Sequence, residues 1–239
     1  MTCAPRPPKP PDTGRVSRYA WGRDYHRVLR KPLRALAAHM DSLQDAGDEL
    51  LLHRQRPGAG ESSGRQRAGL GWIGKEQPGA APRPGVVVLS RRVIVTTLPL
   101  PPDPPIPDFC GTCTRCLDAC PTNAFVEPGV VDSRLCLSWH SIENRGEIPP
   151  ELHPHFGDWV FGCDLCQEVC PWNRDVPVTG EPDFHPRADQ AHPSLERLDS
   201  MDEAEFLESF AGTPIMRAKL QGMQRNARIA QENLRKEIP

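Results

Sequence analysis

The chain has 239 residues, with 29 basic against 31 acidic side chains and a formal net charge of −2. This near balance excludes a chain-wide positive field, so any RNA contact needs a local basic patch. The 28 prolines and the low aromatic content of 6% predict much irregular structure and a core that is small for the length.

The first third of the chain predicts one helix and little else that is regular. Residues 1–14 are rich in proline and predict a disordered lead. Asp24 can cap a helix running to about Asp45, with Pro32 as a kink or as its true start. Residues 53–67 are polar, rich in glycine and without period, which indicates a disordered basic loop.

The next stretch is short of regular structure as well. The segment Gly69–Lys75 predicts an apolar turn in which glycine permits positive φ or close approach of a bulky ligand. Residues 86–89 and 93–96 are β-branched and predict short strands. After the cysteines, a capping box opening at Ser200 predicts a helix up to Phe210, and 215–236 predict one or two more helices.

Eight of the nine cysteines lie between Cys110 and Cys170. Residues 1–11 carry prolines where a signal peptide has its apolar segment, and no apolar run is long enough to span a membrane. We therefore expect a cytoplasmic protein without a membrane segment. In such a reducing compartment these spacings indicate metal binding rather than disulfides.

The cysteines form two runs, C-x2-C-x2-C-x3-C-P from Cys110 to Pro121 and C-x2-C-x3-C-P from Cys163 to Pro171. The first is the run that bacterial ferredoxins use for [4Fe–4S] clusters, in which the cysteine before proline binds the other cluster. One set would then be Cys110, Cys113, Cys116 and Cys170. The other would be Cys120, Cys163 and Cys166, completed by Cys136 as the one nearby cysteine left.

Two other interpretations of the cysteines remain open from the residues alone. Structural zinc also uses C-x2-C pairs, although it rarely takes the longer run. A two-cluster ferredoxin module could also be an electron carrier without catalysis of its own. Such a carrier would show cluster absorbance only.

Five motifs in this order resemble the epoxyqueuosine reductase family over most of residues 15–228. They are Tyr19–His26, Gly69–Lys75, the first cysteine run, Cys136–Ser138 and Gly162–Asn173. The resemblance implies two [4Fe–4S] clusters that feed cobalamin, and removal of the epoxide oxygen of epoxyqueuosine at the wobble position of tRNA. Ser17, Ser138 and Asp164 match positions at which the family contacts cobalamin.

The resemblance also implies the domain order, in an α+β chain. A partial cobalamin-binding α/β domain over 15–107 precedes a ferredoxin-like two-cluster module over 108–175. A helical segment over 176–239 would begin the family's helical repeats, so we expect the chain to be truncated at both ends. The implied partners are tRNA carrying epoxyqueuosine and an external electron donor, and we expect a monomer. Arg217, Lys219, Arg225 and Arg228 could meet tRNA phosphates or form a solvated helix face.

One departure concerns the proton donor, which the family carries in an Asp-Ser/Thr-Gly motif about thirty residues after the Asp that matches Asp24. Arg54 and Gln55 occupy that place, and loss of a general acid costs on the order of 10²–10⁴ in rate. Residues 53–61 can be encoded by codons that, when read one base later, give Ile-Asp-Ser-Gly. The same one-base shift from Glu76 gives an amino-acid sequence similar to that of the family. We therefore interpret both segments as products of a frameshift. A nucleotide sequence whose codons cannot be shifted to give these motifs would contradict this interpretation.

A third interpretation is a reductive dehalogenase, which shares the cobalamin and the two clusters. Arg6 and Arg15 are isolated, so the twin-arginine export signal usual in that class is absent. The sequence therefore favours the epoxyqueuosine reductase resemblance.

Overall fold

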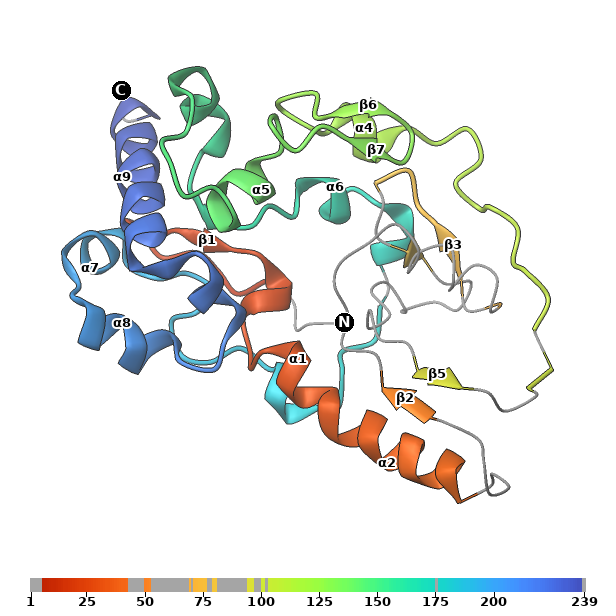
Figure 1. Ribbon diagram of the computed structural model, residues 1–239. Helices are drawn as coiled ribbons and strands as arrows, with labels where there is room; N and C mark the ends of the chain where they lie inside the picture. Colours follow the sequence, from red (N-terminus) through yellow and green to blue (C-terminus); the bar gives the residue numbers. More distant parts are fainter. Residues whose placement is uncertain are drawn as a thin grey trace.

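The computed structural model describes residues 6–42, 50–52, 69, 71–76, 79–80, 94–96, 100–101, 103–174 and 176–237, and all structural statements concern these. Figure 1 shows helices α7, α8 and α9 gathered at one side, with the short strands and the cysteine-bearing segments extending from them. The mixture of helices with several two-stranded sheets confirms the predicted α+β class.

The core is organised around two strands that are far apart in sequence. Strand β1 (Arg15–Val16) pairs in parallel with β8 (Trp159–Phe161), with Arg15 opposite Trp159 and Val16 opposite Phe161. All three residues of β8 are buried, as an uninterrupted apolar strand predicts for a parallel pair covered on both faces. This pairing joins the start of the chain to the segment that precedes the second cysteine run.

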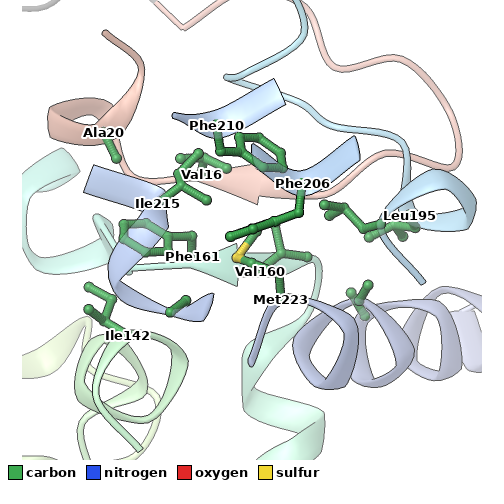
Figure 2. Packing of buried hydrophobic residues seen from close by; sticks show 14 of the residues in the cluster. Val16, Ala20, Ile142, Val160, Phe161, Leu195, Phe206, Phe210, Ile215 and Met223 are labelled. Atoms are coloured by element: carbon green, nitrogen blue, oxygen red, sulfur yellow. The ribbon is translucent and has the colours of Figure 1, made fainter. Parts of the chain in front are cut away.

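Four helical elements enclose this strand pair. They are α7 (Leu195–Ser200), α8 (Glu203–Phe210), the 3-10 helix η5 (Pro214–Arg217) and α9 (Lys219–Glu237). Figure 2 shows Phe206, Ile215 and Met223 packed around Val16 and Phe161. Burial of each such side chain contributes about 1.5–3 kcal/mol relative to exposure. The helices of the last quarter of the chain therefore form one core with its first strand.

Local signals explain where these helices begin. The Ser194 hydroxyl accepts a hydrogen bond from the Arg197 amide and caps α7. The capping box of α8 is formed by Asp202 and Glu205, two residues later than the sequence predicted. The predicted helical region 215–236 is confirmed as η5 followed by α9.

The helix predicted after Asp24 forms in two pieces, α1 (Tyr25–Val28) and α2 (Arg30–Asp41). The Asp24 carboxylate accepts from the His26 amide, which confirms it as the cap. Pro32 lies in the first turn of α2, where its missing N–H costs no intrahelical bond. Pro32 thus marks the start of α2, one of the two outcomes the sequence predicted.

Residues 6–14, part of the stretch expected to be a disordered lead, are packed against the core. The Lys9 ammonium lies 2.6 Å from a carboxylate oxygen of Asp158. Thr13 forms an antiparallel bridge with Ser194, and the Gly14 amide donates to the Pro193 carbonyl. Proline-rich composition gave no sign of these contacts because every partner lies more than a hundred residues away.

Three further sheets are short antiparallel pairs. Strand β2 (Leu50–Leu52) pairs with β5 (Ile94–Thr96), and β3 (Trp72–Ile73) pairs with β4 (Gly79–Ala80). β6 (Phe125–Glu127) and β7 (Val130–Val131) form a hairpin whose turn contains Gly129 at a φ of 82°. The strand predicted at 93–96 is confirmed as β5. The predicted strand at 86–89 and the predicted loop at 53–67 lie outside the described residues.

The cysteine module contains only short helices. They are α4 (Arg115–Asp118), α5 (Leu137–Ile142), α6 (Leu165–Glu168), and the 3-10 helices η2 (Pro150–Phe156) and η3 (Pro171–Asn173). Two further 3-10 turns, η1 (Arg18–Ala20) and η4 (Pro182–Phe184), flank the core. Of the helices in the described part of the chain, none combines the length and the apolar character needed to cross a bilayer.

Candidate metal centre

The two cysteine runs form the same local structure. In each, the first cysteine of C-x2-C-x3-C-P precedes a four-residue helix that carries the second, and the third stands before proline. The helices are α4, with Cys116, and α6, with Cys166, and they pack against each other. All eight cysteines of the module are free thiols. Equal spacing in the sequence has therefore produced two equivalent halves of one site.

The structure brings Cys170 to the cysteines of the first run. Burial raises the pKa of the Cys170 thiol, and the nearby Cys110 and Cys113 raise it further. Burial also raises the pKa of Cys116 to about 11, with Glu76 and Cys170 adding to the shift. The four cysteines predicted as one set are thus electrostatic neighbours.

The second set gathers in the same way around α6. Burial raises the pKa of Cys163 and of Cys166 to about 12, and Cys136 contributes to both shifts. Cys120 reaches this region through its own loop, where the Thr122 hydroxyl donates to the Leu135 carbonyl at 2.7 Å, next to Cys136. The Cys120 sulfur accepts from the Ala124 amide at 3.3 Å.

The donor set fits iron–sulfur clusters better than a single ion. Within the described residues, no group of three or more His, Cys, Asp and Glu side chains converges closely enough to hold one metal ion. Zinc requires such convergence, because all its ligands bind one atom at about 2.0–2.3 Å. The thiolates of a [4Fe–4S] cluster bind different iron atoms and stand further apart. Eight free thiols, on the two runs and at Cys136, supply the number of ligands that two such clusters need.

The glycine-rich motif Gly69–Lys75 supports the first cysteine run. The Trp72 indole N–H donates to the Cys110 sulfur at 3.4 Å, and the Lys75 ammonium donates to the carbonyls of Gly111 and Cys113 at 2.7 and 2.9 Å. The Trp72 ring also packs edge-on against Trp172, with centroids 4.9 Å apart, so it links the two runs. Gly69 has a φ of 63°, the positive value that the sequence predicted for this turn.

Glu76 is a site residue that sequence reasoning missed. It is 5% exposed, and its carboxylate folds back over Gly74, where a Cβ would come within 2.5 Å of it. Burial raises the pKa of the Glu76 carboxyl, whereas hydrogen bonds with Cys116 and Gln167 oppose that shift. No local pattern could reveal it, because Glu76 opens a polar stretch without period.

Two of the three residues predicted to contact cobalamin bind each other. The Ser17 hydroxyl donates a short hydrogen bond to the Asp164 carboxylate, and both side chains are buried. The other Asp164 oxygen accepts from the Arg18 amide at 2.8 Å and from Arg6 at 3.0 Å. Burial raises the pKa of the Asp164 carboxyl, against the opposing effect of these donors. This network ties η1 to the loop that carries Cys163.

The third residue, Ser138, lies at an open surface. It lines a hollow of about 330 Å³ together with Cys136, Trp139 and Glu143. Trp139 is 38% exposed, so a large aromatic face borders the hollow next to a predicted cluster ligand. Of the three predicted cobalamin contacts, Ser138 is the one that the structure places at a concave surface.

The basic residues near the C-terminus are mostly engaged within the chain. Arg225 donates to the carbonyls of His140 and Asn144 at 2.8 and 3.0 Å and also to that of Gly146. Arg217 is paired with Glu143, and Arg228 with Asp199, at 2.5 Å each. Only Lys219, among the four, has no such contact in the described part of the chain. The two possibilities considered from sequence, tRNA contact or a solvated face, do not describe Arg225, which is a structural anchor.

Comparison with known proteins agrees with these observations. A family model described as a 4Fe-4S double cluster binding domain matches residues 109–173, and the model of epoxyqueuosine reductase QueG matches residues 3–52. An epoxyqueuosine reductase of Gloeobacter violaceus is 44% identical over 92% of this chain and 70% of its own length. That of Synechocystis is 45% identical over 91% of this chain and 75% of its own.

Solved structures match as well. Epoxyqueuosine reductase from Bacillus subtilis, with a catalytic loop swung out of its active site, superposes with a TM-score of 0.86 at 31% identity. The match covers 97% of this chain and 61% of that one. A second structure is of an epoxyqueuosine reductase with an epoxyqueuosine-modified tRNA stem loop. It gives a TM-score of 0.85 at 31% identity, and the match covers 98% of this chain and 62% of that one.

Fold and site together define a protein of the double [4Fe–4S] cluster class, whose cluster module shares its core with the first strand. Identity, coverage and structural likeness agree on a single group of proteins. The chain belongs to the epoxyqueuosine reductase family. It spans about three fifths of the length of the matching solved chains.

Proposed function

We propose that this chain reduces epoxyqueuosine to queuosine in tRNA, with electrons passed through two [4Fe–4S] clusters. The main support for this function is that the chain contains two equivalent cysteine runs and is 44–45% identical to epoxyqueuosine reductases. Removal of an epoxide oxygen as water consumes two electrons and two protons. Two one-electron clusters match that demand, and an external donor must reload them.

We assign the ligands as the sequence predicted. One cluster is held by Cys110, Cys113, Cys116 and Cys170, and the other by Cys120, Cys136, Cys163 and Cys166. The mutual effects of these thiols on their pKa values support both sets, although Cys120 is linked to its set only through Thr122 and Leu135. We also propose a cytoplasmic location, which this use of eight cysteines as ligands supports.

Cobalamin is proposed as the cofactor that receives these electrons. When bound, it supplies a cobalt centre that accepts single electrons and reacts with the epoxide carbon. Ser138 would contact it from the hollow beside Cys136. Ser17 and Asp164, being paired with each other, would hold the Cys163 loop at the edge of that site. The substrate is proposed from the stem-loop complex of a relative.

The reaction needs a proton donor at the departing oxygen, but Arg54 and Gln55 stand where the family has its acid. The deciding experiment restores the motif with Arg54→Asp, Gln55→Ser and Arg56→Gly. Both proteins are loaded anaerobically with clusters and cobalamin, and queuosine formation is measured on tRNA carrying epoxyqueuosine with a chemical reductant.

We expect the restored protein to exceed the original by on the order of 10²–10⁴ in rate. Cys166→Ser in the restored background serves as the control and should abolish turnover. A restored, fully loaded protein that forms no queuosine would reject the proposed function. Cluster absorbance without any cobalamin spectrum would instead favour the electron carrier.

A further inference from the structure

Four cations on helices α1 and α2 form one continuous stripe. Arg27, Arg30, Lys31 and Arg34 follow the spacing i, i+3, i+4, i+7, and all four side chains are exposed. Leu29, which joins the two helices, keeps a helical conformation with φ −75° and ψ −14°. Residues three and four apart are neighbours on a helix surface, so the four side chains share one side. We call these four residues the basic stripe.

The basic stripe carries four positive charges close together, without a carboxylate partner in the described structure. Residues 25–40 include no Asp or Glu, and no ion pair joins the stripe to a carboxylate elsewhere in the described structure. By contrast, Arg217 and Arg228 near α9 are each paired with an acid. Within the described residues, the basic stripe is therefore a local run of positive charge with no acidic residue in between.

The position of the stripe also works against helix stability. Arg30 and Lys31 stand in the first turn of α2, which has no acidic residue. Positive charge is unfavourable there because the helix dipole places partial positive charge at the N-terminus. Like charges three and four residues apart repel as well. A sequence that accepts both costs indicates a surface that meets negative charge from outside.

We propose that the basic stripe binds the phosphate backbone of RNA, and that it is the surface by which this chain holds the stem of its tRNA. The identity of the RNA rests on the proposed function, whereas the charge complementarity does not. In Figure 1, α2 runs along the lower edge of the molecule, separate from α7, α8 and α9. Binding to acidic lipid is disfavoured because α2 lacks a wide exposed apolar face: Ala37 is 3% exposed, and Leu36, at 50%, is the one large apolar side chain that α2 exposes among the described residues.

The test is the salt dependence of RNA binding. The cluster-loaded chain, a stripe variant (Arg30→Gln, Lys31→Gln, Arg34→Gln) and a control variant (Arg197→Gln, Arg235→Gln, Lys236→Gln) are titrated with an unmodified tRNA anticodon stem-loop. Both variants remove three exposed positive charges, so they change the overall field equally. Circular dichroism and cluster absorbance verify that each variant is folded and loaded.

We expect the slope of log Kd against log salt concentration to fall by about 2–3 in the stripe variant. In the control variant we expect a change below about 1. Equal changes in the two variants, or an unchanged slope in the stripe variant, would overturn the proposal. So would binding to vesicles containing phosphatidylserine that depends on the stripe while RNA binding does not. Stripe-dependent RNA binding, together with no queuosine formation by the restored and fully loaded protein, would reject the proposed function alone and leave this surface standing.

Discussion

The buried Ser17 hydroxyl donates to the Asp164 carboxylate, and Gly162 makes that approach possible. Gly162 has a φ of 70°, and a Cβ there would lie 2.5 Å from the Cβ of Ser17. The loop that presents Cys163 is therefore held by a contact between the first strand region and the second cysteine run. Residues that sequence assigned to a cofactor have a structural role that can be measured.

Loss of this contact should destabilise the protein, and loss of Asp164 should cost more than loss of the Ser17 hydroxyl. Ser17→Ala removes one hydrogen bond to a charged group and should lower the free energy of unfolding by about 1.5–3 kcal/mol. Asp164→Ala should cost about 3–5 kcal/mol, because it removes the buried carboxylate that accepts from Ser17, from the Arg18 amide and from Arg6. Urea denaturation of the cluster-loaded protein measures both. Asp183→Asn, in an exposed pair with Arg23, is the control and should cost less than about 1 kcal/mol.

The two ligand sets predict a pattern of iron loss. Cys110→Ser and Cys170→Ser should each reduce iron by about four atoms per chain, and the double variant should lose no more than either alone. Cys110→Ser combined with Cys163→Ser should remove both clusters. Iron analysis after anaerobic reconstitution gives the result. A Cys110/Cys170 double variant without any cluster would contradict the assignment.

Arg225 should matter for stability and not for RNA. Its guanidinium donates to three carbonyls between His140 and Gly146, and burial lowers its pKa. Arg225→Ala leaves these acceptors unpaired and should cost about 2–4 kcal/mol in the free energy of unfolding. Lys219→Gln should leave stability unchanged within about 0.5 kcal/mol. Weakened RNA binding by folded Arg225→Lys, with stability retained, would show that the anchor role is wrong.

Tyr19 should make the fold sensitive to alkaline pH. Burial raises the pKa of its hydroxyl, and neighbouring Tyr25, 6.2 Å away between ring centroids, raises it further. The folded state therefore keeps Tyr19 neutral, whereas the unfolded chain ionises it near pH 10. The free energy of unfolding should decrease as the pH rises through about 10. In the Tyr19→Phe variant it should decrease less over the same pH range.

Denaturant unfolding at neutral and alkaline pH measures this difference. Tyrosinate absorbance offers a second measurement, because the chain has only two tyrosines. Ionisation of both tyrosines below the pH of unfolding would contradict the prediction.

Sequence alone predicted the features that depend on neighbours in the chain. The cysteine spacing indicated the local structure of both runs, because each run folds over a few residues around its own short helix. Asp24 as a cap was predictable for the same reason. Contacts between distant segments were not predictable. Arg6 bonded to Asp164, and Glu76 buried beside Cys116, depend on the tertiary fold, and neither residue lies in a distinctive pattern.

The parallel pairing of β1 with β8 has a consequence for folding during synthesis on the ribosome. Val16 cannot meet Phe161 until residues 159–161 have been synthesised, which takes about 7–30 s at about 5–20 residues per second. During that delay the first cysteine run emerges with its thiols unprotected by the finished core. Iron delivery and completion of the fold must therefore coincide late in translation or follow it.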